Sequence, residues 1–398
     1  MRFFKTPAFL ARPHRGPTPI ETKSQLRLWR NVPRTPFLKL ITASRKTQLL
    51  LRMSLRKSSR QVASRSHVIS LSILFLLAFP TQAKTKDPPL LRYEDSRVSM
   101  ACTYTIVVYG TDARQLPLIV SAALDEVDRI DNLMSNYKPE SALSRINQEG
   151  SKGPVVVEPE LFNFIQLCVR YSQESDGAFD ITVGPLMKAW GFFRGEGRIP
   201  WTFELWNILR KVGYQQLILN PKERTVQFAR SGMELDLGGI AKGYAVDRVV
   251  SLLQEYNVKR AFVSAGGSTV YGLGSPPNGD GWEVNIRDPI YPNDPRKRAG
   301  VVILKNRSLS VSGNYEKFFR VRGVTYSHIM NPRTGRPVEN MLSVAVLTDT
   351  GVDGDALDDV FYVQGVEKSK IYLQKHPGAA VFLFLPEADR QWKMVHLK

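Results

Sequence analysis

The residues best suited to chemistry lie in a short stretch, residues 233–247, that reads MELDLGGIAKGYAVD. An apolar run with acidic residues leads into Gly238 and Gly239, and Lys242 follows at the start of a helical pattern. Glycine lets the backbone approach a ligand closely, the first-turn N–H groups of a helix attract an anion, and a lysine adds positive charge. The spacing matches neither of the two common nucleotide-binding motifs. Both a phosphate site and a tight strand-to-helix turn without a ligand therefore stay open.

A second set of candidates is acidic: Asp355, Asp358 and Asp359 lie within GVDGDALDDVFYVQG. Positions i, i+3 and i+4 share one face of a helix, where like charges cost about 0.2–0.5 kcal/mol per pair. A helix N-terminus offsets part of this repulsion. A hard cation such as Mg²⁺ would offset more, because it binds carboxylates together with substrate phosphates. The pattern indicates either a metal site or a solvated acidic cap.

The third candidate is His328, at the edge of the loop YSHIMNPRTGRPV. Asn-Pro and Thr-Gly pairs are turn signals, so this loop has a defined shape. A histidine there can titrate near neutral pH and act as a general base. A purely structural histidine beside a turn is the competing interpretation.

The elements that would position these residues mix strands and helices. Apolar spacing predicts amphipathic helices at 115–133, 158–174 and 240–255, and an acidic helix near 352–364. Strand-like runs include 100–109 and 233–237. The strands and helices do not alternate in steady βαβ units, which favours an α+β fold. We expect residues 87–398 to form a single compact unit with mixed β-sheets flanked by helices.

The net charge of +18 is confined to the N-terminal part of the chain. Residues 1–86 contain 18 Lys and Arg and one acidic residue, whereas residues 87–398 contain 37 basic and 36 acidic residues. A nearly neutral body argues against a nucleic-acid-binding surface. We therefore predict no nucleic-acid partner.

The basic leader resembles a signal peptide for export. A 12-residue apolar run at 68–79 follows four basic residues, and Thr81-Gln82-Ala83 comes after it, with cleavage expected near Ala83. The run is short for a membrane span, which needs roughly 20 apolar residues. Met53 could be the true start. We expect a periplasmic or otherwise exported protein, and an uncleaved leader would instead anchor it to the inner membrane.

Seven blocks of the body resemble, in order, the signature blocks of the ApbE-type FAD:protein FMN transferases, which identifies a family. The resemblance covers about residues 98–386, and the order of the blocks makes it specific. The blocks are MACTY (100–104), MSNYKPESALSRIN (134–147), DGAFDITVGPLMKAWGF (176–192), ELDLGGIAKGYAVD (234–247), SVSGNYEKFF (310–319), SHIMNPRTG (327–335) and GDALDDVF (354–361).

The resemblance implies a reaction and a set of site residues. The family uses Mg²⁺ to cleave FAD and transfers FMN to a Thr or Ser hydroxyl of an acceptor protein, releasing AMP. Carried over by position, it implies metal ligation by the Gly239 carbonyl and Asp355, with Asp358 in the same motif and Asp359 as a further ligand. It implies FAD contacts at Met100, Tyr137, Ala178, Phe179, Asp180, Asp236, Lys242 and Ile329.

Two positions depart from the family pattern. Gly239 often corresponds to alanine, which matters little because the implied ligand is the backbone oxygen. Asp359 stands where Thr or Ser is usual. A full negative charge there could hold the cation more tightly or favour two cations.

The residue roles follow from charge. We expect Asp355 to hold the metal, Lys242 to offset charge toward the leaving AMP, and His328 to take the proton of the acceptor hydroxyl. The acceptor would be an exported or membrane redox protein carrying a flavinylation motif. Two alternatives stay open: an FAD pyrophosphatase that gives FMN and AMP, and a non-catalytic flavin-binding protein.

Overall fold

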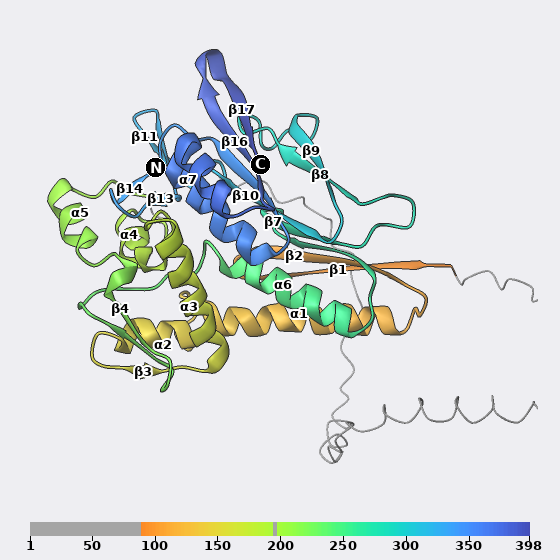
Figure 1. Ribbon diagram of the computed structural model, residues 1–398, viewed down its shortest axis with the longest axis horizontal. Helices are drawn as coiled ribbons and strands as arrows, with labels where there is room; N and C mark the ends of the chain where they lie inside the picture. Colours follow the sequence, from red (N-terminus) through yellow and green to blue (C-terminus); the bar gives the residue numbers. More distant parts are fainter. Residues whose placement is uncertain (1–88, 194–196) are drawn as a thin grey trace, which may run out of the picture. The chain divides into compact units, whose positions relative to one another are not determined.

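The computed structural model describes residues 89–193 and 197–398 (Figure 1). The expected leader, with its apolar run and its cleavage site near Ala83, lies outside these residues. Within them, no helix combines the length and the apolar character needed to cross a membrane.

An eight-stranded antiparallel sheet forms the centre of the domain. Its strands pair in chain order, and each neighbouring pair is antiparallel. They are β1 (Leu91–Ser99), β2 (Cys102–Gly110), β6 (Arg260–Ala265), β7 (Thr269–Leu273), β10 (Arg307–Gly313), β15 (Ser343–Thr348), β16 (Ala380–Glu387) and β17 (Gln391–Leu397).

Helices cover one face of this sheet and a β-hairpin covers the other (Figure 1). Successive side chains of a strand point to opposite faces, so Val344 and Val346 of β15 join the helical core while Ala345 joins the hairpin side. The helices are α1 (Gln115–Met134), α6 (Ala241–Glu255) and α7 (Gly351–Lys375), with α3 (Pro159–Glu174) packed against α6 and α7, and the hairpin is β8 (Trp282–Arg287) with β9 (Arg298–Leu304).

Smaller elements build the rest of the body, and five of them share a separate apolar cluster. That cluster joins helix α4 (Gly184–Ala189), helix α5 (Thr202–Leu209), the hairpin of β11 (Phe318–Val321) and β12 (Val324–Ser327), and β13 (Met330–Asn331). The others are α2 (Ala142–Glu149), β3 (Val155–Val156), η1 (Ile181–Val183), η2 (Tyr214–Gln216), β4 (Leu217–Asn220), β5 (Thr225–Phe228), β14 (Arg336–Pro337) and η3 (Ala388–Arg390).

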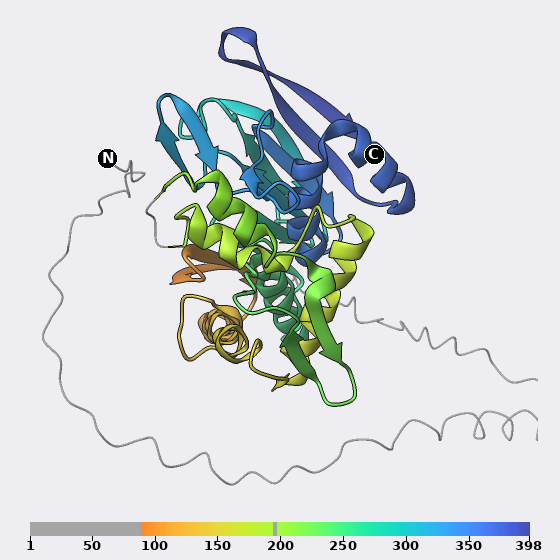
Figure 2. The ribbon, with the colours of Figure 1, turned by 90° about the vertical axis from the view of Figure 1, so that its left-hand side faces the viewer.

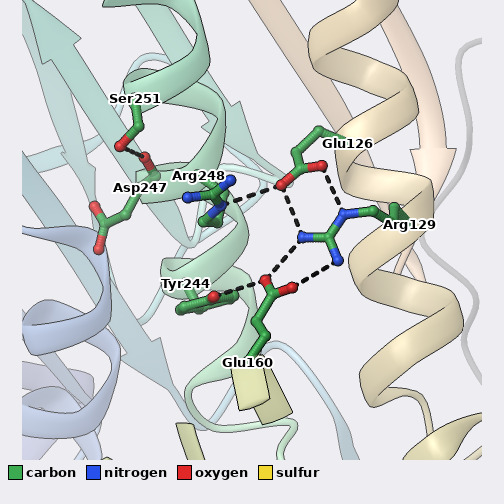
Figure 3. A network of polar contacts seen from close by, with 7 residues as sticks. All are labelled: Glu126, Arg129, Glu160, Tyr244, Asp247, Arg248 and Ser251. Atoms are coloured by element: carbon green, nitrogen blue, oxygen red, sulfur yellow. Dashed lines mark hydrogen bonds and ion pairs between the residues drawn. The ribbon is translucent and has the colours of Figure 1, made fainter. Parts of the chain in front are cut away.

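A charged network joins α1, α3 and α6 (Figure 3). The guanidinium of Arg129 donates to both carboxylate oxygens of Glu160, each at 2.7 Å, and its Nε donates to Glu126 at 2.7 Å. The Tyr244 hydroxyl donates to Glu160 at 2.7 Å, and Arg248 Nε donates to Glu126 at 3.1 Å. Two acids and two bases are thus matched, and these hydrogen bonds hold the pKa of both glutamates below its usual range.

The α+β class is confirmed, and three of the predicted helices agree with α1, α3 and α6 to within one residue. One detail differs, since every strand pair in the described residues is antiparallel and the sheets are therefore not mixed in direction. The fourth helix, α7, runs on beyond 364, although Gly365 (φ 69°) breaks its helical geometry.

One strand prediction was wrong. The segment 233–237 is not in a sheet: Leu235 exchanges two hydrogen bonds with the Asn147 side chain, and Asp236 N–H donates to the Ile181 carbonyl. The backbone of this segment is thus paired with a side chain and with the short helix η1, which an apolar pattern cannot reveal. The predicted strand at 100 begins two residues later, because Met100 occupies a hairpin turn with φ 49°.

Candidate active site

All the predicted site residues line one cavity of about 530 Å³. They come from six separate stretches of the chain, so the fold brings together residues that lie far apart in the sequence. They are Met100, Tyr137, Ala178, Phe179, Asp180, Asp236, Gly239, Lys242, His328, Ile329, Asp355, Asp358 and Asp359.

The N-terminus of α6 forms one wall of the cavity. Lys242 Nζ donates to Ser268 Oγ at 2.7 Å, which holds the ammonium group at the cavity. The expectation of open first-turn donors is corrected here. The amides of Ile240 and Ala241 donate to the Leu237 carbonyl, and the amide of Gly243 donates to Asp355 Oδ2 at 2.6 Å. The Asp355 carboxylate therefore occupies part of the anion site that we expected a phosphate to fill at the start of α6.

Helices α6 and α7 cross at two glycines, Gly243 and Gly351. A side chain on Gly243 would overlap the carbonyl group of Gly351, so only glycine permits this approach. Asp247 of α6 fixes the crossing, because its carboxylate accepts hydrogen bonds from the amides of Gly351 (2.6 Å) and Val352 (2.8 Å). Burial raises the pKa of Asp247 to about 6. The crossing sets Asp355 against the start of α6.

Three aspartates of α7 form the opposite wall. Asp355 accepts from Gly243 N–H and from the Thr269 hydroxyl. The Asp359 carboxylate lies against the α-carbon of Gly239 and accepts from Ser312 Oγ at 3.3 Å. Burial and the negative charge of Asp355 raise the pKa of Asp359 to about 7. Burial, together with Asp359 and Asp355, raises the pKa of Asp358 as well.

This wall suits a hard divalent cation, although not through a cluster of three carboxylates. Among the described residues, no three His, Cys, Asp or Glu side chains are grouped to hold a metal ion. Asp355 and Asp359 repel each other, and the Asp359 carboxylate lies against Gly239. The fully buried Ser310 hydroxyl lies beside Asp355 and supplies a further hard oxygen there. Hard oxygen donors with uncompensated negative charge are what Mg²⁺ binds.

A basic pair faces these acids, and only one of its members was predicted. Lys317 also lines the cavity, and burial together with Lys242 lowers its pKa. The Nδ1 atom of His328 lies 3.2 Å from the carbonyl oxygen of Lys317. Burial, Lys317 and Lys242 lower the pKa of His328 to about 3. The imidazole is therefore neutral at physiological pH, and it is a weak base while both lysines are uncompensated.

The remaining predicted contacts form an apolar and aromatic wall. Tyr137 is half exposed and stacks on Phe193, with ring centroids 4.6 Å apart and planes at 7°. Phe179 is buried and lies within van der Waals distance of Gly239. Such surfaces suit planar aromatic rings.

Two predicted contacts have carboxylates that are already used by the fold. Asp180 accepts from the amide and hydroxyl of Thr182 and from the amide of Tyr214, and burial raises its pKa. Asp236 accepts from the amide of Gly238 at 2.8 Å. We infer that Asp180 shapes the cavity wall through the backbone it holds.

Sequence reasoning missed four residues that hold the charged groups in place. Ser268, Thr269 and Ser312 bind Lys242, Asp355 and Asp359, and Lys317 adds the second positive charge. Ser268 follows a Gly-Gly loop, and Ser312 and Lys317 lie in a block already singled out, which was the only signal for them.

Comparisons with known proteins agree on one family. The ApbE family matches residues 100–383. The FAD:protein FMN transferase of Escherichia coli K12 is 31% identical over 318 residues, covering 78% of this chain and 88% of that protein. The enzyme of the same name from Treponema pallidum is 34% identical over 285 residues, covering 67% and 78%.

Solved structures give the same result. The ApbE protein of Thermotoga maritima matches with a TM-score of 0.70 and 28% identity, over 77% of this chain and 97% of that one. The flavin transferase ApbE of Vibrio cholerae matches with a TM-score of 0.68 and 27% identity, over 78% and 98%.

Proposed function

This chain belongs to the ApbE family, and we propose that it transfers FMN from FAD to a Thr or Ser hydroxyl of an acceptor protein and releases AMP. It is an enzyme, since its curated relatives are named FAD:protein FMN transferases and its structural neighbours are flavin transferases. The observation that carries the proposal is the single cavity, in which an acidic wall faces Lys242 and an aromatic wall adjoins both.

We assign the two walls to the two parts of FAD. Tyr137 and Phe179 provide surfaces for the planar rings, and Lys242 and Lys317 provide positive charge for the pyrophosphate. Asp355, Asp359 and the Gly239 carbonyl would hold Mg²⁺, with Asp358 behind them. When bound, the ion would neutralise phosphate charge and polarise the phosphorus centre.

The reaction is an in-line displacement at phosphorus. The acceptor oxygen forms a bond to the FMN phosphorus, the bond from that phosphorus to the bridging oxygen breaks, and AMP leaves with the electron pair. The protein contributes by positioning and by stabilising charge, and Lys242 is placed to stabilise the leaving phosphate.

His328 is our proposed acceptor for the hydroxyl proton. Its pKa of about 3 arises partly from Lys317 and Lys242. Bound pyrophosphate would offset both lysines and raise this pKa, so His328 would become a stronger base only when the substrate is present. Wild-type transfer by His328→Ala at neutral pH would remove this role.

One experiment separates transfer from its alternatives. The protein is incubated with FAD, Mg²⁺ and an exported FMN-binding domain that carries a Gly-containing motif ending in Thr, and the Thr→Val form of that domain is the control. Flavin fluorescence on the denatured acceptor, absent from the control, supports transfer. Free FMN and AMP with an unlabelled acceptor would show hydrolysis instead, and intact FAD would contradict both.

Hydrolysis of FAD to FMN and AMP is a second candidate function, because of Asp359. A carboxylate against Gly239 adds charge where the family usually has a hydroxyl. Asp359→Thr should raise the ratio of protein-bound flavin to free FMN if the wild type leans toward hydrolysis.

We also propose that the protein is exported, by its leader, to the periplasm or beyond. The support is the sequence pattern at 68–83 alone. N-terminal sequencing of the mature protein should begin at Lys84, and an intact leader would favour anchoring at the inner membrane.

A further inference from the structure

Helix α5 and the residue just before it, Trp201, expose three large aromatic side chains to solvent. Trp201, Phe203 and Trp206 are 82%, 74% and 55% exposed, and they lie within six positions of one another. Soluble proteins seldom expose a contiguous group of this kind without a function. We refer to these three residues as the α5 aromatic face.

The α5 aromatic face is ordered by its own contacts. The rings of Phe203 and Trp206 stack with centroids 6.2 Å apart, and the Arg210 guanidinium lies 5.0 Å from the Trp206 ring. Residues 203, 206 and 210 share one side of a helix. The other side is also apolar, with Leu205 buried against the domain. A helix that is apolar on both sides is normally covered on both.

The charge around this helix is positive although the body is nearly neutral. The segments 197–213 and 318–327 contain five basic residues and one acidic residue, and the acid, Glu204, is paired with Arg198. Arg320 and Arg322 are exposed on the neighbouring β11–β12 hairpin.

The position of α5 bears on which kind of partner the α5 aromatic face could contact. Helix α5 lies at one end of the body together with the β11–β12 hairpin (Figure 1), and Figure 2 looks onto that end. The aromatic side chains are carried on a projecting helix, so they suit insertion into a flat, soft surface better than docking into a partner's groove.

We propose that the α5 aromatic face inserts into the surface of a bilayer that contains anionic phospholipid. Tryptophan and phenylalanine favour the boundary between head groups and acyl chains, and arginines beside them bind anionic lipid. The inference is independent of flavin transfer, since it concerns residues outside the cavity.

Vesicle sedimentation with the full chain tests the proposal. Phosphatidylcholine vesicles with phosphatidylglycerol should bind the wild type more tightly than pure phosphatidylcholine. Trp201→Ser with Trp206→Ser should weaken binding about tenfold, and Arg210→Gln about fivefold. Leu118→Ser and Ile371→Ser, which remove exposed side chains elsewhere (71% and 58% exposed), should change nothing.

A local readout separates this face from the leader, which could bind lipid itself. With 5-fluorotryptophan in the full chain, spin-labelled lipid in the vesicles should broaden the ¹⁹F signals of Trp201 and Trp206 and spare buried Trp190. Binding without this broadening would overturn the proposal. Broadening that follows protein concentration without vesicles would also overturn it, because the partner would then be a second copy of the chain.

Discussion

Helix α6 takes part in two polar clusters that differ in charge balance. On one side, Arg129 and Arg248 match Glu126 and Glu160 (Figure 3), and the pKa of both glutamates is lowered. At its N-terminus, three aspartates of α7 face the cavity with two lysines, and the pKa of each aspartate is raised. The matched cluster stabilises the fold. The aspartates repel one another, and under the proposed function a bound cation would offset that repulsion.

The largest effect is expected at the aspartates. Asp355→Ala removes a buried charge that would hold Mg²⁺, so Mg²⁺-dependent turnover of FAD should fall by about 10³-fold or more. Steady-state release of AMP measures this. Turnover close to that of the wild type would remove the metal assignment.

Substitutions in the charge-matched cluster of Figure 3 should change the stability of the fold and not the turnover of FAD. Arg129→Ala leaves two carboxylates without their main partner and should lower the free energy of unfolding by about 2 kcal/mol at neutral pH. Lys370→Ala, which breaks an exposed pair with Glu367, should cost about 0–0.5 kcal/mol. Urea unfolding compares the two.

The pH dependence of this loss has a defined sign. Because the folded-state pKa of Glu126 and Glu160 is lowered, the stability that Arg129 provides is present above the unfolded carboxylate pKa. It is lost as pH falls through the folded value. A difference between wild type and Arg129→Ala that grew in acid would contradict this account.

The aspartates should show the opposite pH dependence. The folded-state pKa of Asp359 is raised to about 7, so its contribution to stability is present below the unfolded pKa. It is lost as pH rises through 7. Asp359→Thr should therefore stabilise the metal-free protein at neutral pH by about 1 kcal/mol and reduce the increase in Tm on adding Mg²⁺. Thermal unfolding with and without chelator tests both.

The smallest change concerns His328. Lys317→Met removes one of the two charges that depress its pKa, so the pKa of His328 should rise toward the ordinary value of about 6.5. NMR titration of the imidazole signals measures it. Lys305→Met, at an exposed turn, serves as control, and an equal shift in that variant would refute the role of Lys317.

The sequence predicted the elements and the first layer of the site better than the contacts behind them. Apolar periodicity located α1 and α6, and the ordered blocks located Lys242 and Asp355 on one cavity. Thr269, which donates to Asp355, does so because β7 packs against α7. The residues next to Thr269 in the sequence do not indicate that contact. The strand prediction at 233–237 was wrong for the same reason, because the hydrogen-bond partners of this segment, Asn147 and Ile181, lie far away in the chain.

The meeting of Gly243 with Gly351 also has a consequence for how such a protein can change over time. Neither position tolerates even one extra carbon. The distance between α6, which carries Lys242, and α7, which carries the aspartates, is therefore fixed at this crossing. A change in the chemistry of the site would therefore have to come from the side chains around this crossing, such as the one at position 359, and not from its spacing.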